Sequence, residues 1–373
     1  MRKLLILLLR LTLTIINLVV FLHILFILYK GYLFMQVKKN YVISIYEANK
    51  NDAGSKAKSD IDKILAKDGF EVIYKGFNIS HDIFGKIRKL KYKYLDIPKI
   101  VKSHTMDNIF INYPLYSSFL YNSLIANIRK YSDAKIYLII HDIEALRLFS
   151  DNLDYIKAEM KTLNEVSGLI VHNTKMQTWL IKQGINVPIV NLEIFDYLNP
   201  QPLNTSCTEL SSVCFAGNLE KSSFLQEITF PINIYGPNPK DNYPPCVTYM
   251  GQYLPDELPK HLTSAFGLVW DGAGIQKCDG VYGKYMRYNN PHKVSLYLSS
   301  GIPVIIWKKA ALADFIVNNN LGFVVNNLNQ VPEILSSLSK EQYELMKANV
   351  INVAKDLRQG KYTLKAINKM LKL

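Results

Sequence analysis

Cysteine is scarce in this chain of 373 residues, which holds four cysteines and no C-x-x-C pair. So few, widely spaced thiols fit neither a disulfide scaffold nor a zinc knuckle, and we expect ordinary reduced side chains. The sequence also lacks an H-E-x-x-H motif, a G-x-S-x-G motif and a Walker phosphate loop. It therefore carries none of the short signatures of zinc proteases, α/β-hydrolases or P-loop nucleotide-binding proteins.

Low-complexity tracts and repeats of roughly 20 to 50 residues are also absent, so nothing indicates a solenoid. Apolar residues make up 49% of the chain and charged residues 20%, a balance unlike that of collagen, a disordered tail or a coiled coil. At roughly 150 residues per domain, the length predicts two folded domains.

Short β-rich apolar runs alternate with helical stretches from residue 41 onward, which is typical of βαβ units and parallel sheets. The expected strands are residues 41–46, 70–74, 108–112, 135–140, 168–171, 188–191, 212–215, 232–235, 246–250, 266–270, 303–306 and 323–325. A polar, Pro-containing stretch at 199–206 separates the sixth strand from the seventh. We therefore predict an α/β fold with two doubly wound, Rossmann-like domains, which bind ligands at the carboxyl ends of their strands.

The first segment of the chain is apolar. Residues 11–29 contain no Lys, Arg, Asp or Glu, which is close to the roughly 20 residues that a membrane-spanning helix needs. No small-residue cleavage site follows, so we expect residues 1–37 to form an uncleaved hydrophobic helix that anchors the chain. A helix lying in the membrane interface is one alternative. A misread start is another, because Met35 precedes a second possible beginning.

The motif at residues 215–224 follows the first strand of the second domain. Gly217 allows a tight turn, Asn218 offers donors and acceptors, and Lys221 places a cation where a phosphate can approach a helix start. A plain strand-to-helix turn would have the same pattern.

A second motif, at residues 289–306, predicts a helix start, a short helix and a buried strand. His292 and Lys293 lie beside the expected helix N-terminus, whose unpaired N–H groups suit a diphosphate. In the alternative interpretation Asn290 only caps the helix and Lys293 is only solvated. Asp271 is expected at the carboxyl end of a neighbouring strand.

His141 and Asp142 follow the strand at 135–140 and are therefore expected at a carboxyl end. A carboxylate at that place can accept a proton from a sugar hydroxyl. Another role is equally compatible, in which Asp142 caps the next helix while Glu144 and Arg147 form a local pair.

The polar loop after the first strand contains Asp52, Gly54 and Lys56 and could close on a ligand or be simple surface. Asp60 and Asp62 spell a D-x-D motif, the metal–nucleotide motif of one glycosyltransferase class. On the expected helix two residues at i and i+2 point about 200° apart, so we do not expect these carboxylates to share a metal ion.

Taken in order, the motifs at 217–221, 266–270, 290–305 and 321–325 resemble those of the bacterial β-1,6-galactofuranosyltransferases. They are also similar to those of the glucosyltransferases that add the second sugar to serine-rich-repeat adhesins. The resemblance covers about residues 40–370. It implies the two-domain GT-B architecture and a nucleotide-diphosphate sugar donor, most often UDP-linked, bound mainly by the second domain. We expect no metal and no cofactor besides this donor.

The resemblance also implies site residues, because Lys221 and Lys293 match the family's diphosphate-binding cations. The loop at 52–56 matches the family's first-domain loop near the sugar and acceptor, and His141–Asp142 matches the family's His-Asp pair at the end of a first-domain strand. The expected donor-binding residues are Gly217, Asn218, Lys221, Tyr235, Gly236, Asp271, Asn290, His292, Lys293 and Ser295. The expected catalytic residues are Asp142 and His141, and the expected acceptor-side residues are Asp52, Gly54 and Lys56.

We therefore expect an anchor at 1–37, an acceptor-side domain at 38–199, a nucleotide-sugar-binding domain at 200–350 and a basic helix at 351–373. The expected activity is metal-independent transfer of a hexose (galactofuranose, glucose or galactose) from a UDP-sugar to a hydroxyl group. The acceptor would be a cell-surface glycan, such as capsule, exopolysaccharide or O-antigen, or a glycoprotein precursor. A catalytically silent sugar-nucleotide-binding or scaffold component of a polysaccharide assembly complex is the alternative.

The net charge of +13 is unevenly distributed, since residues 200–339 hold 9 cations and 10 carboxylates. The excess lies in the first segment, in the C-terminal helix and in a cluster made of Lys86, Arg88, Lys89, Lys91 and Lys93. We therefore expect the basic residues to face an anionic membrane surface and not nucleic acid. The other expected partners are the UDP-sugar, a glycan or lipid-linked acceptor and a second copy in a homo-oligomer. The expected location is the plasma or inner membrane, with the catalytic domains on the cytoplasmic face.

Overall fold

The computed structural model describes residues 18–26, 39–47, 53–77, 82–115, 117–205 and 209–373. Residues 40–373 form one compact unit, and residues 1–39 belong to a separate one. Residues 18–26 are helical with exposed side chains, while the rest of the expected anchor lies outside the described residues. Within the described ranges, no helix combines the length and the apolar character needed to cross a bilayer. The membrane anchor therefore stays a prediction.

The first sheet consists of six parallel strands in the order β2-β1-β3-β4-β5-β6. Its strands are β1 (Asn40–Glu47), β2 (Glu71–Phe77), β3 (Asn108–Tyr113), β4 (Lys135–Ile140), β5 (Gly168–Val171) and β6 (Ile189–Asn191). The helical segments that connect them are α2 (Ala53–Lys67), α3 (Ile83–Lys91), the π-helical turn η1 (Tyr92–Asp96), α4 (Ile97–Ser103), α5 (Ser118–Tyr131), α6 (Glu144–Arg147), α7 (Leu153–Leu163) and α8 (Thr174–Lys182). β3 and β5 are buried along their whole length, as expected for strands of a sheet with helices on both faces.

The second sheet also has six parallel strands, in the order β12-β11-β10-β7-β8-β9. Its strands are β7 (Val213–Ala216), β8 (Ile232–Tyr235), β9 (Val247–Tyr249), β10 (Phe266–Val269), β11 (Val304–Trp307) and β12 (Gly322–Val325). The helices around it are α9 (Leu258–His261), α10 (Gly280–Tyr285), α11 (His292–Ser299), α12 (Ala313–Asn318) and α13 (Val331–Ser337), and the 3-10 turns are η2 (Leu219–Lys221), η3 (Ser223–Gln226) and η4 (Leu328–Gln330). In both sheets the order of the strands reverses beside the strand that comes first along the chain, β1 or β7, which is the doubly wound arrangement.

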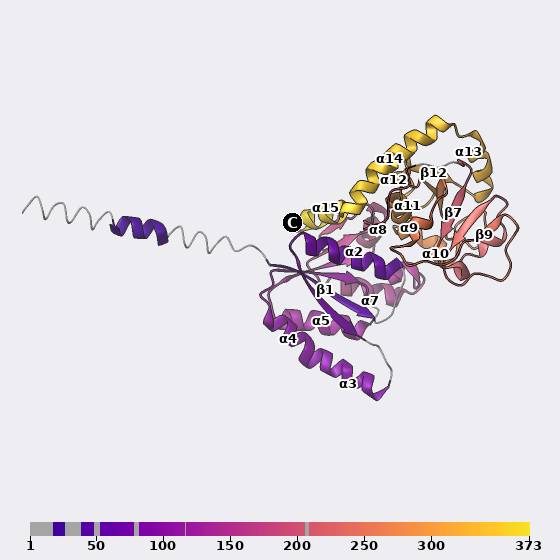
Figure 1. Cartoon of the computed structure of the whole chain (residues 1–373). Helices are drawn as coiled ribbons and strands as arrows, with labels where there is room; N and C mark the ends of the chain where they lie inside the picture. The colour runs from indigo at the N-terminus through magenta and orange to yellow at the C-terminus, as the bar shows by residue number, and fades with distance from the viewer. Residues whose placement is uncertain (1–17, 27–38, 48–52, 78–81, 116, 206–208) are drawn as a thin grey trace, which may run out of the picture. The chain divides into compact units, whose positions relative to one another are not determined.

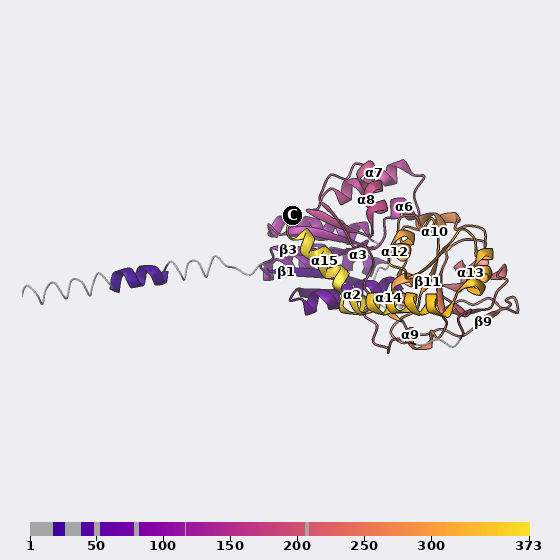
Figure 2. The same cartoon turned by 90° about the horizontal axis from the view of Figure 1, so that it is seen from above.

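The last two helices connect the two sheets, as Figures 1 and 2 show. α14 (Lys340–Gln359) packs against α11 at the second sheet. Gly360 then adopts a left-handed conformation with φ of 76°, which ends α14 and turns the chain. α15 (Lys361–Met370) crosses to the first sheet, where it packs against α2, β5 and β6. The end of the chain therefore helps to cover the first sheet.

The predicted fold is confirmed, because each of the twelve expected strands overlaps an observed one. The hydrophobic core around the second sheet is continuous, and the first sheet has a separate apolar cluster on each face. The expected boundary between residues 350 and 351 falls inside α14, so the basic end of the chain does not begin a separate helix there.

Candidate active site

Strands β7 and β8 end in two glycines whose backbones touch. A Cβ atom on Gly236 would lie 1.8 Å from the carbonyl oxygen of Gly217, and the φ of 140° at Gly236 also favours glycine. The Gly217 N–H donates to the carbonyl of Tyr235 at 3.0 Å. The Tyr235 ring is buried, and its hydroxyl donates to the carbonyl of His261 at 2.8 Å. The two glycines thus pack backbone against backbone without intervening side chains, while the buried Tyr235 ring lies directly before Gly236.

Lys293 and Asp271 meet at the same edge of the second sheet. Lys293 is in the first turn of α11 and Asp271 follows β10, and Nζ lies 2.6 Å from the Asp271 Oδ1 atom. The Cε atom of Lys293 is 3.1 Å from the position that a Cβ on Gly217 would occupy. Three of the expected donor-binding residues therefore lie together.

Lys221 lies on the same side. Its Nζ donates to the Tyr282 hydroxyl at 3.1 Å and lies 4.6 Å from the centroid of that ring. Tyr282 belongs to α10, where the Cβ position of the next residue, Gly283, is 2.9 Å from the Asp271 carbonyl oxygen. Asn218 accepts from the backbone N–H of Glu220 at 3.1 Å, so its side chain caps the turn η2, as the simpler interpretation of this motif expects.

Asn290 and Ser295 join the two sheets from the inside. The Asn290 amide nitrogen donates to the carbonyls of His172 at 2.8 Å and Glu193 at 3.0 Å, and its backbone N–H donates to the His172 ring at 2.9 Å. The Ser295 hydroxyl donates to the Phe195 carbonyl at 2.6 Å. Both side chains are buried, so the structure gives these two expected donor-binding residues partners within the protein.

His292 lies in an aromatic cluster, with its ring centroid 5.7 Å from that of Phe195 and 5.4 Å from that of Tyr197. His141 and His172 pack on the same Phe195 ring, at 5.4 and 4.9 Å. Burial lowers the pKa of His292 to about 3 and that of His172 to about 4, so both rings are neutral near pH 7. His292 therefore adds no positive charge beside Lys293.

A chain of buried hydrogen bonds orients His141. Its Nε2 lies 2.8 Å from the Asn112 amide oxygen, and the Asn112 amide nitrogen donates to Asp62 at 3.1 Å. Asp62 also accepts from the Ser44 hydroxyl at 2.6 Å. Because an amide oxygen only accepts, His141 carries its proton on Nε2 and keeps a lone pair on Nδ1. Burial lowers the pKa of His141 well below its usual value, which keeps the ring neutral.

Asp142 stands between two different partners. One carboxylate oxygen lies 3.2 Å from Arg147, and the Tyr285 hydroxyl donates to the carboxylate while it accepts from the Ile143 N–H at 3.2 Å. Burial raises the pKa of Asp142 to about 6, and the Arg147 charge opposes that rise. The helix that follows has no side-chain cap, so Asp142 does not serve as one, whereas the expected Glu144–Arg147 pair is present.

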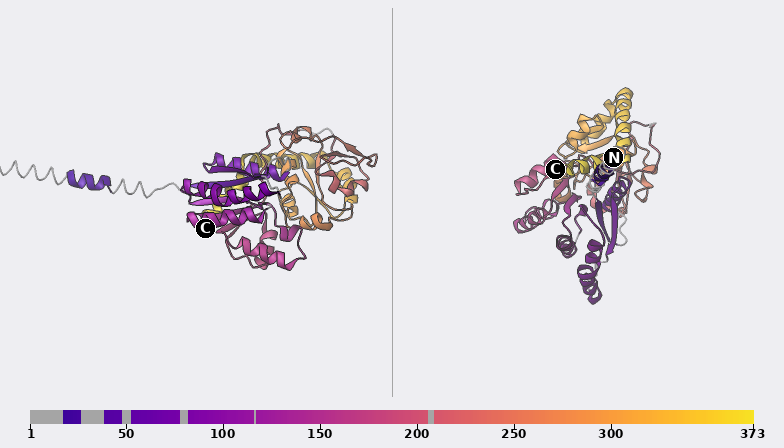
Figure 3. Two further views of the ribbon diagram at one scale, coloured as in Figure 1. Left: turned by 90° about the horizontal axis from the view of Figure 1, so that it is seen from below. Right: turned by 90° about the vertical axis from the view of Figure 1, so that its left-hand side faces the viewer.

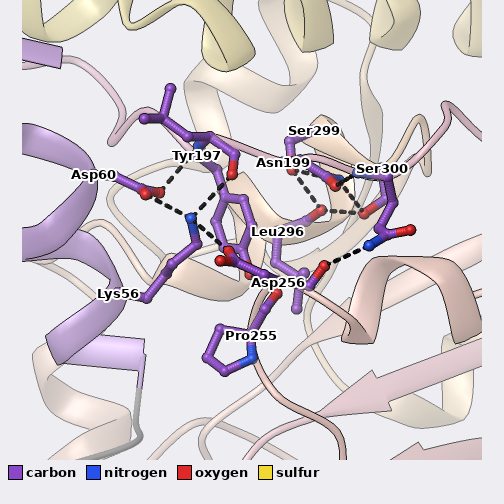
Figure 4. A network of polar contacts seen from close by, with 11 residues as sticks. Lys56, Asp60, Tyr197, Asn199, Pro255, Asp256, Leu296, Ser299 and Ser300 are labelled. Atoms are coloured by element: carbon purple, nitrogen blue, oxygen red, sulfur yellow. Dashed lines mark hydrogen bonds and ion pairs between the residues drawn. The ribbon is translucent and has the colours of Figure 1, made fainter. Parts of the chain in front are cut away.

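Lys56 is buried in a network that Figure 4 shows. Its Nζ is 2.5 Å from Asp60 and 3.0 Å from Asp256, donates to the Leu198 carbonyl at 3.0 Å and lies 4.8 Å from the Tyr197 ring centroid. Lys56 therefore connects α2 to the segment after β6, which contains Leu198, and to the loop between β9 and α9, which contains Asp256. The other two expected acceptor-side residues differ: Asp52 lies outside the described residues, and Gly54 is in the first turn of α2.

The two carboxylates of the D-x-D motif point to separate partners, Asp60 to Lys56 and Asp62 to Ser44. In the part of the chain that the structure describes, no three His, Cys, Asp or Glu side chains are grouped as ligands of a metal ion.

Sequence reasoning missed Asn112, Tyr282 and Tyr285. The last two come from α10 and reach Lys221 and Asp142, which are distant in the sequence. Tyr282 and Tyr285 are three residues apart and follow a glycine-rich loop. This spacing could have indicated them, because it places both on one side of a helix. Nothing near Asn112 indicated its contact with His141.

A hollow of about 580 Å³ lies between α8, the segment after α10 and the segment after β11. It is lined by Thr174, Lys175, Thr178, Arg287, Tyr288, Lys308 and Lys309. α8 begins just after β5, and Lys308 directly follows β11, so the hollow lies at the carboxyl edges of both sheets. Four of the seven lining residues carry positive charge.

Comparison with known proteins adds the decisive observation. Residues 39–194 match the model of the Glucosyltransferase 3-like N-terminal domain, and residues 213–370 match that of the C-terminal domain. The chain belongs to the Glucosyltransferase 3-like family. Both matches include the strands whose carboxyl ends carry the candidate site, and the predicted family resemblance is confirmed.

Among curated relatives of this Glucosyltransferase 3-like chain, the β-1,6-galactofuranosyltransferase WbbI of Escherichia coli K12 is 32% identical over 69% of this chain and 76% of its own length. Glucosyltransferase 3 of Streptococcus gordonii is 28% identical over 64% of this chain and 71% of its own. These homologues are glycosyltransferases, and so is this chain.

Solved structures show the same fold at low identity. OtsA in its apo form has a TM-score of 0.56 and 11% identity, covering 89% of this chain and 99% of that one. The α-glucosyltransferase AGT in complex with UDP has a TM-score of 0.55 and 12% identity, covering 89% and 98%. The predicted GT-B architecture and enzyme class are confirmed.

Proposed function

We propose that this chain transfers a hexose from a UDP-sugar to a hydroxyl group of a growing glycan. The observation that carries the proposal is the group formed by Gly217, Lys221, Asp271 and Lys293 at the carboxyl edge of the second sheet. Two lysines beside glycines that let a ligand approach the backbone closely suit a diphosphate. The names of the relatives support galactofuranose or glucose as the transferred sugar, and galactose is the third candidate.

The leaving UDP gains negative charge as the bond between the sugar and the diphosphate breaks. Lys221 and Lys293 lie where they can neutralise that charge, and the N-terminus of α11 adds its positive dipole end. Lys293 pairs with Asp271 at 2.6 Å, so its charge is held at this edge before the donor arrives. We propose that these groups suffice without a divalent metal, so that excess EDTA leaves the transfer rate unchanged.

On the opposite side, Asp142 is the proposed base that takes the proton of the acceptor hydroxyl. Its pKa of about 6 leaves the carboxylate mostly ionised near pH 7 and still close to the operating pH, which is favourable for a general base. His141 is neutral and its Nε2–H is held by Asn112, so its Nδ1 lone pair is left to accept a hydrogen bond from a sugar hydroxyl, and its low pKa keeps it from taking the proton.

The cationic hollow supports an acceptor that carries phosphate, such as a lipid-linked glycan precursor of a capsule, exopolysaccharide or O-antigen. Lys308 and Lys309 line it from the second sheet and Lys175 from the first. Activated sugars and lipid-linked acceptors meet at the cytoplasmic face of the bacterial plasma or inner membrane, which is the location that we propose. A glycoprotein precursor, the other acceptor class, would not need this charge.

The proposal is tested by release of UDP from UDP-glucose, UDP-galactose and UDP-galactofuranose, with and without membrane acceptor. Release with one of these donors that rises when acceptor is added, with the labelled sugar recovered in the acceptor, is expected. Binding of the donors without any release would contradict the proposal and would favour a scaffold component of an assembly complex.

A further inference from the structure

Six large apolar side chains of α3 and η1 point into solvent. They are Ile83 (68% exposed), Phe84 (65%), Ile87 (57%), Leu90 (54%), Tyr94 (62%) and Leu95 (63%). At 3.6 residues per turn, these positions fall on one side of a helix. Gly85 and Tyr92 are buried and face the body of the protein. A helix on a protein surface normally turns its apolar side toward the core, but here the broad apolar side faces solvent.

Positive charge lies along both edges of this apolar side. Residues 83–95 contain five cations and no carboxylate. On a helical projection Lys86 and Lys93 border one edge and Arg88 borders the other. Among the described residues, no carboxylate pairs with Lys86 or Lys93, whereas Arg88 lies 3.8 Å from Asp82 at the start of the helix. Lys91 falls within the apolar side and lies 3.6 Å from Asp96.

The position of α3 leaves this side open. β2, which precedes α3, is an edge strand of the first sheet, and the element that α3 contacts most is its own continuation, η1. Figure 1 shows α3 at the outer end of the first sheet, and the right-hand view of Figure 3 shows the same end from another direction. The candidate active site lies elsewhere, at the carboxyl edges of the two sheets.

We propose that this α3–η1 surface, residues 83–95, docks on an anionic lipid bilayer. An apolar helix face bordered by Lys and Arg matches a membrane interface, where the apolar side chains enter the acyl boundary and the cations meet lipid phosphates. A second copy of the chain fits less well, because a symmetric contact would bring the cations of both copies together. A nucleic acid offers nothing to cover six apolar side chains.

This inference goes beyond the proposed function, since it concerns where the enzyme works and not what it transfers. It is also separate from the apolar first segment, because the surface is made by residues of the compact unit 40–373. If the first segment holds the chain at the membrane, the α3–η1 surface would fix how the compact unit meets the bilayer.

The test is hydrogen exchange of the full chain mixed with vesicles, followed by mass spectrometry of the peptides that cover residues 83–95. Vesicles of phosphatidylcholine alone are compared with vesicles that contain phosphatidylglycerol. We expect exchange in 83–95 to slow by roughly tenfold on the anionic vesicles only, because cations favour an anionic leaflet. The peptides of α14 (Lys340–Gln359) serve as the internal control and should not change.

The variant Lys86→Gln/Arg88→Gln/Lys93→Gln keeps the apolar face and removes the three cations at its edges. Because each Lys or Arg near an anionic leaflet strengthens binding about fivefold, docking should weaken roughly 100-fold and the protection should disappear. The matched control is Lys340→Gln/Lys355→Gln/Lys372→Gln, which removes the same charge from the exposed side chains near the end of the chain and should keep the protection. The same variants should release UDP at the wild-type rate when a soluble acceptor is supplied.

Three results would overturn the inference. One is equal exchange of residues 83–95 on both kinds of vesicle. Another is protection that survives in the Lys86/Arg88/Lys93 variant. The third is protection that arises without vesicles, rises with protein concentration and accompanies a doubled mass in light scattering, which would make the surface an interface between two copies. Failure of UDP release alone would count against the proposed function and not against this surface.

Discussion

Burial and the two partners of Asp142 have opposite effects on its pKa. Burial disfavours the charged form, whereas the Arg147 charge and the hydrogen bond from Tyr285 favour it, and the pKa of Asp142 settles at about 6. A carboxyl group with an ordinary pKa near 4 would be a weaker base toward a sugar hydroxyl. The side chain is also 20% exposed, so an acceptor can reach it.

We therefore expect the transfer rate to fall as the pH drops below about 6, because protonated Asp142 cannot accept a proton. Asp142→Asn should lower kcat by roughly 100-fold or more at every pH, since an amide is no base. Glu144→Gln is the matched control. The Glu144 charge raises the Asp142 pKa, so its loss should shift the fall of the transfer rate to lower pH and leave the maximal rate unchanged. An Asp142→Asn enzyme with the wild-type pH profile would exclude Asp142 as the base.

At this scale the sequence predicted part of the site. Gly217, Lys221 and Lys293 lie next to strand ends and helix starts. The local sequence pattern alone therefore predicted that they lie at the carboxyl edge of the second sheet. Tyr285 and Asn112 were not predictable, because each meets its partner only after two distant segments fold together. Asn290 and Ser295 were expected at the donor because of their position at a helix start, yet their side chains turn inward to carbonyl groups of the first sheet region.

Among the elements, α15 depends on one buried carboxylate. Asp196 accepts from the backbone N–H groups of Thr363 at 2.6 Å and Tyr362 at 3.3 Å, in the first turn of this helix. A helix start leaves such N–H groups without partners inside the helix, so Asp196 completes α15 from a distant part of the chain. Burial raises the pKa of Asp196 to about 7, in spite of these hydrogen bonds.

Asp196→Ala should lower the free energy of unfolding by about 1–3 kcal/mol, because two buried N–H groups lose their acceptor. Asp314→Ala removes a carboxylate that is 77% exposed in a surface pair with Lys175, and it should change stability by less than about 1 kcal/mol. Urea unfolding followed by circular dichroism measures both. Equal midpoints for the two variants would mean that Asp196 does not hold α15.

Elements were the scale at which the sequence was most informative. Alternation of short β-branched runs with longer amphipathic stretches predicted every strand, because parallel strands with both faces covered need continuous apolar runs. The return of α15 to the first sheet was not predicted, since an amphipathic pattern shows that a helix has an apolar side but not which sheet that side covers. The outward apolar side of α3 was hidden for the same reason.

The two sheets of residues 40–373 are joined by the Lys56 network of Figure 4. Lys56 and Asp60 are 6% and 1% exposed, so neither charge can be solvated if its partner is removed. Lys56→Met should therefore cost about 3–5 kcal/mol of stability, and Lys56→Met/Asp60→Leu should recover most of that loss. Lys63→Met, on the exposed side of α2, is the control and should be near neutral.

Thermal unfolding of these variants distinguishes a structural from a substrate-binding Lys56. If a Lys56→Met chain melts like the wild type but transfers no sugar, Lys56 binds the acceptor, as expected from the sequence, and is not a structural residue.

In the whole molecule, sugar transfer requires that the edge of the second sheet bind the diphosphate of the donor. Titration calorimetry of UDP into the wild type and Lys293→Ala tests it most directly, with Lys340→Ala as the exposed control. Loss of one charge-assisted hydrogen bond should weaken UDP binding by roughly 10- to 100-fold, with an unchanged melting temperature and no sugar transfer. UDP binding of wild-type strength by Lys293→Ala would contradict the account.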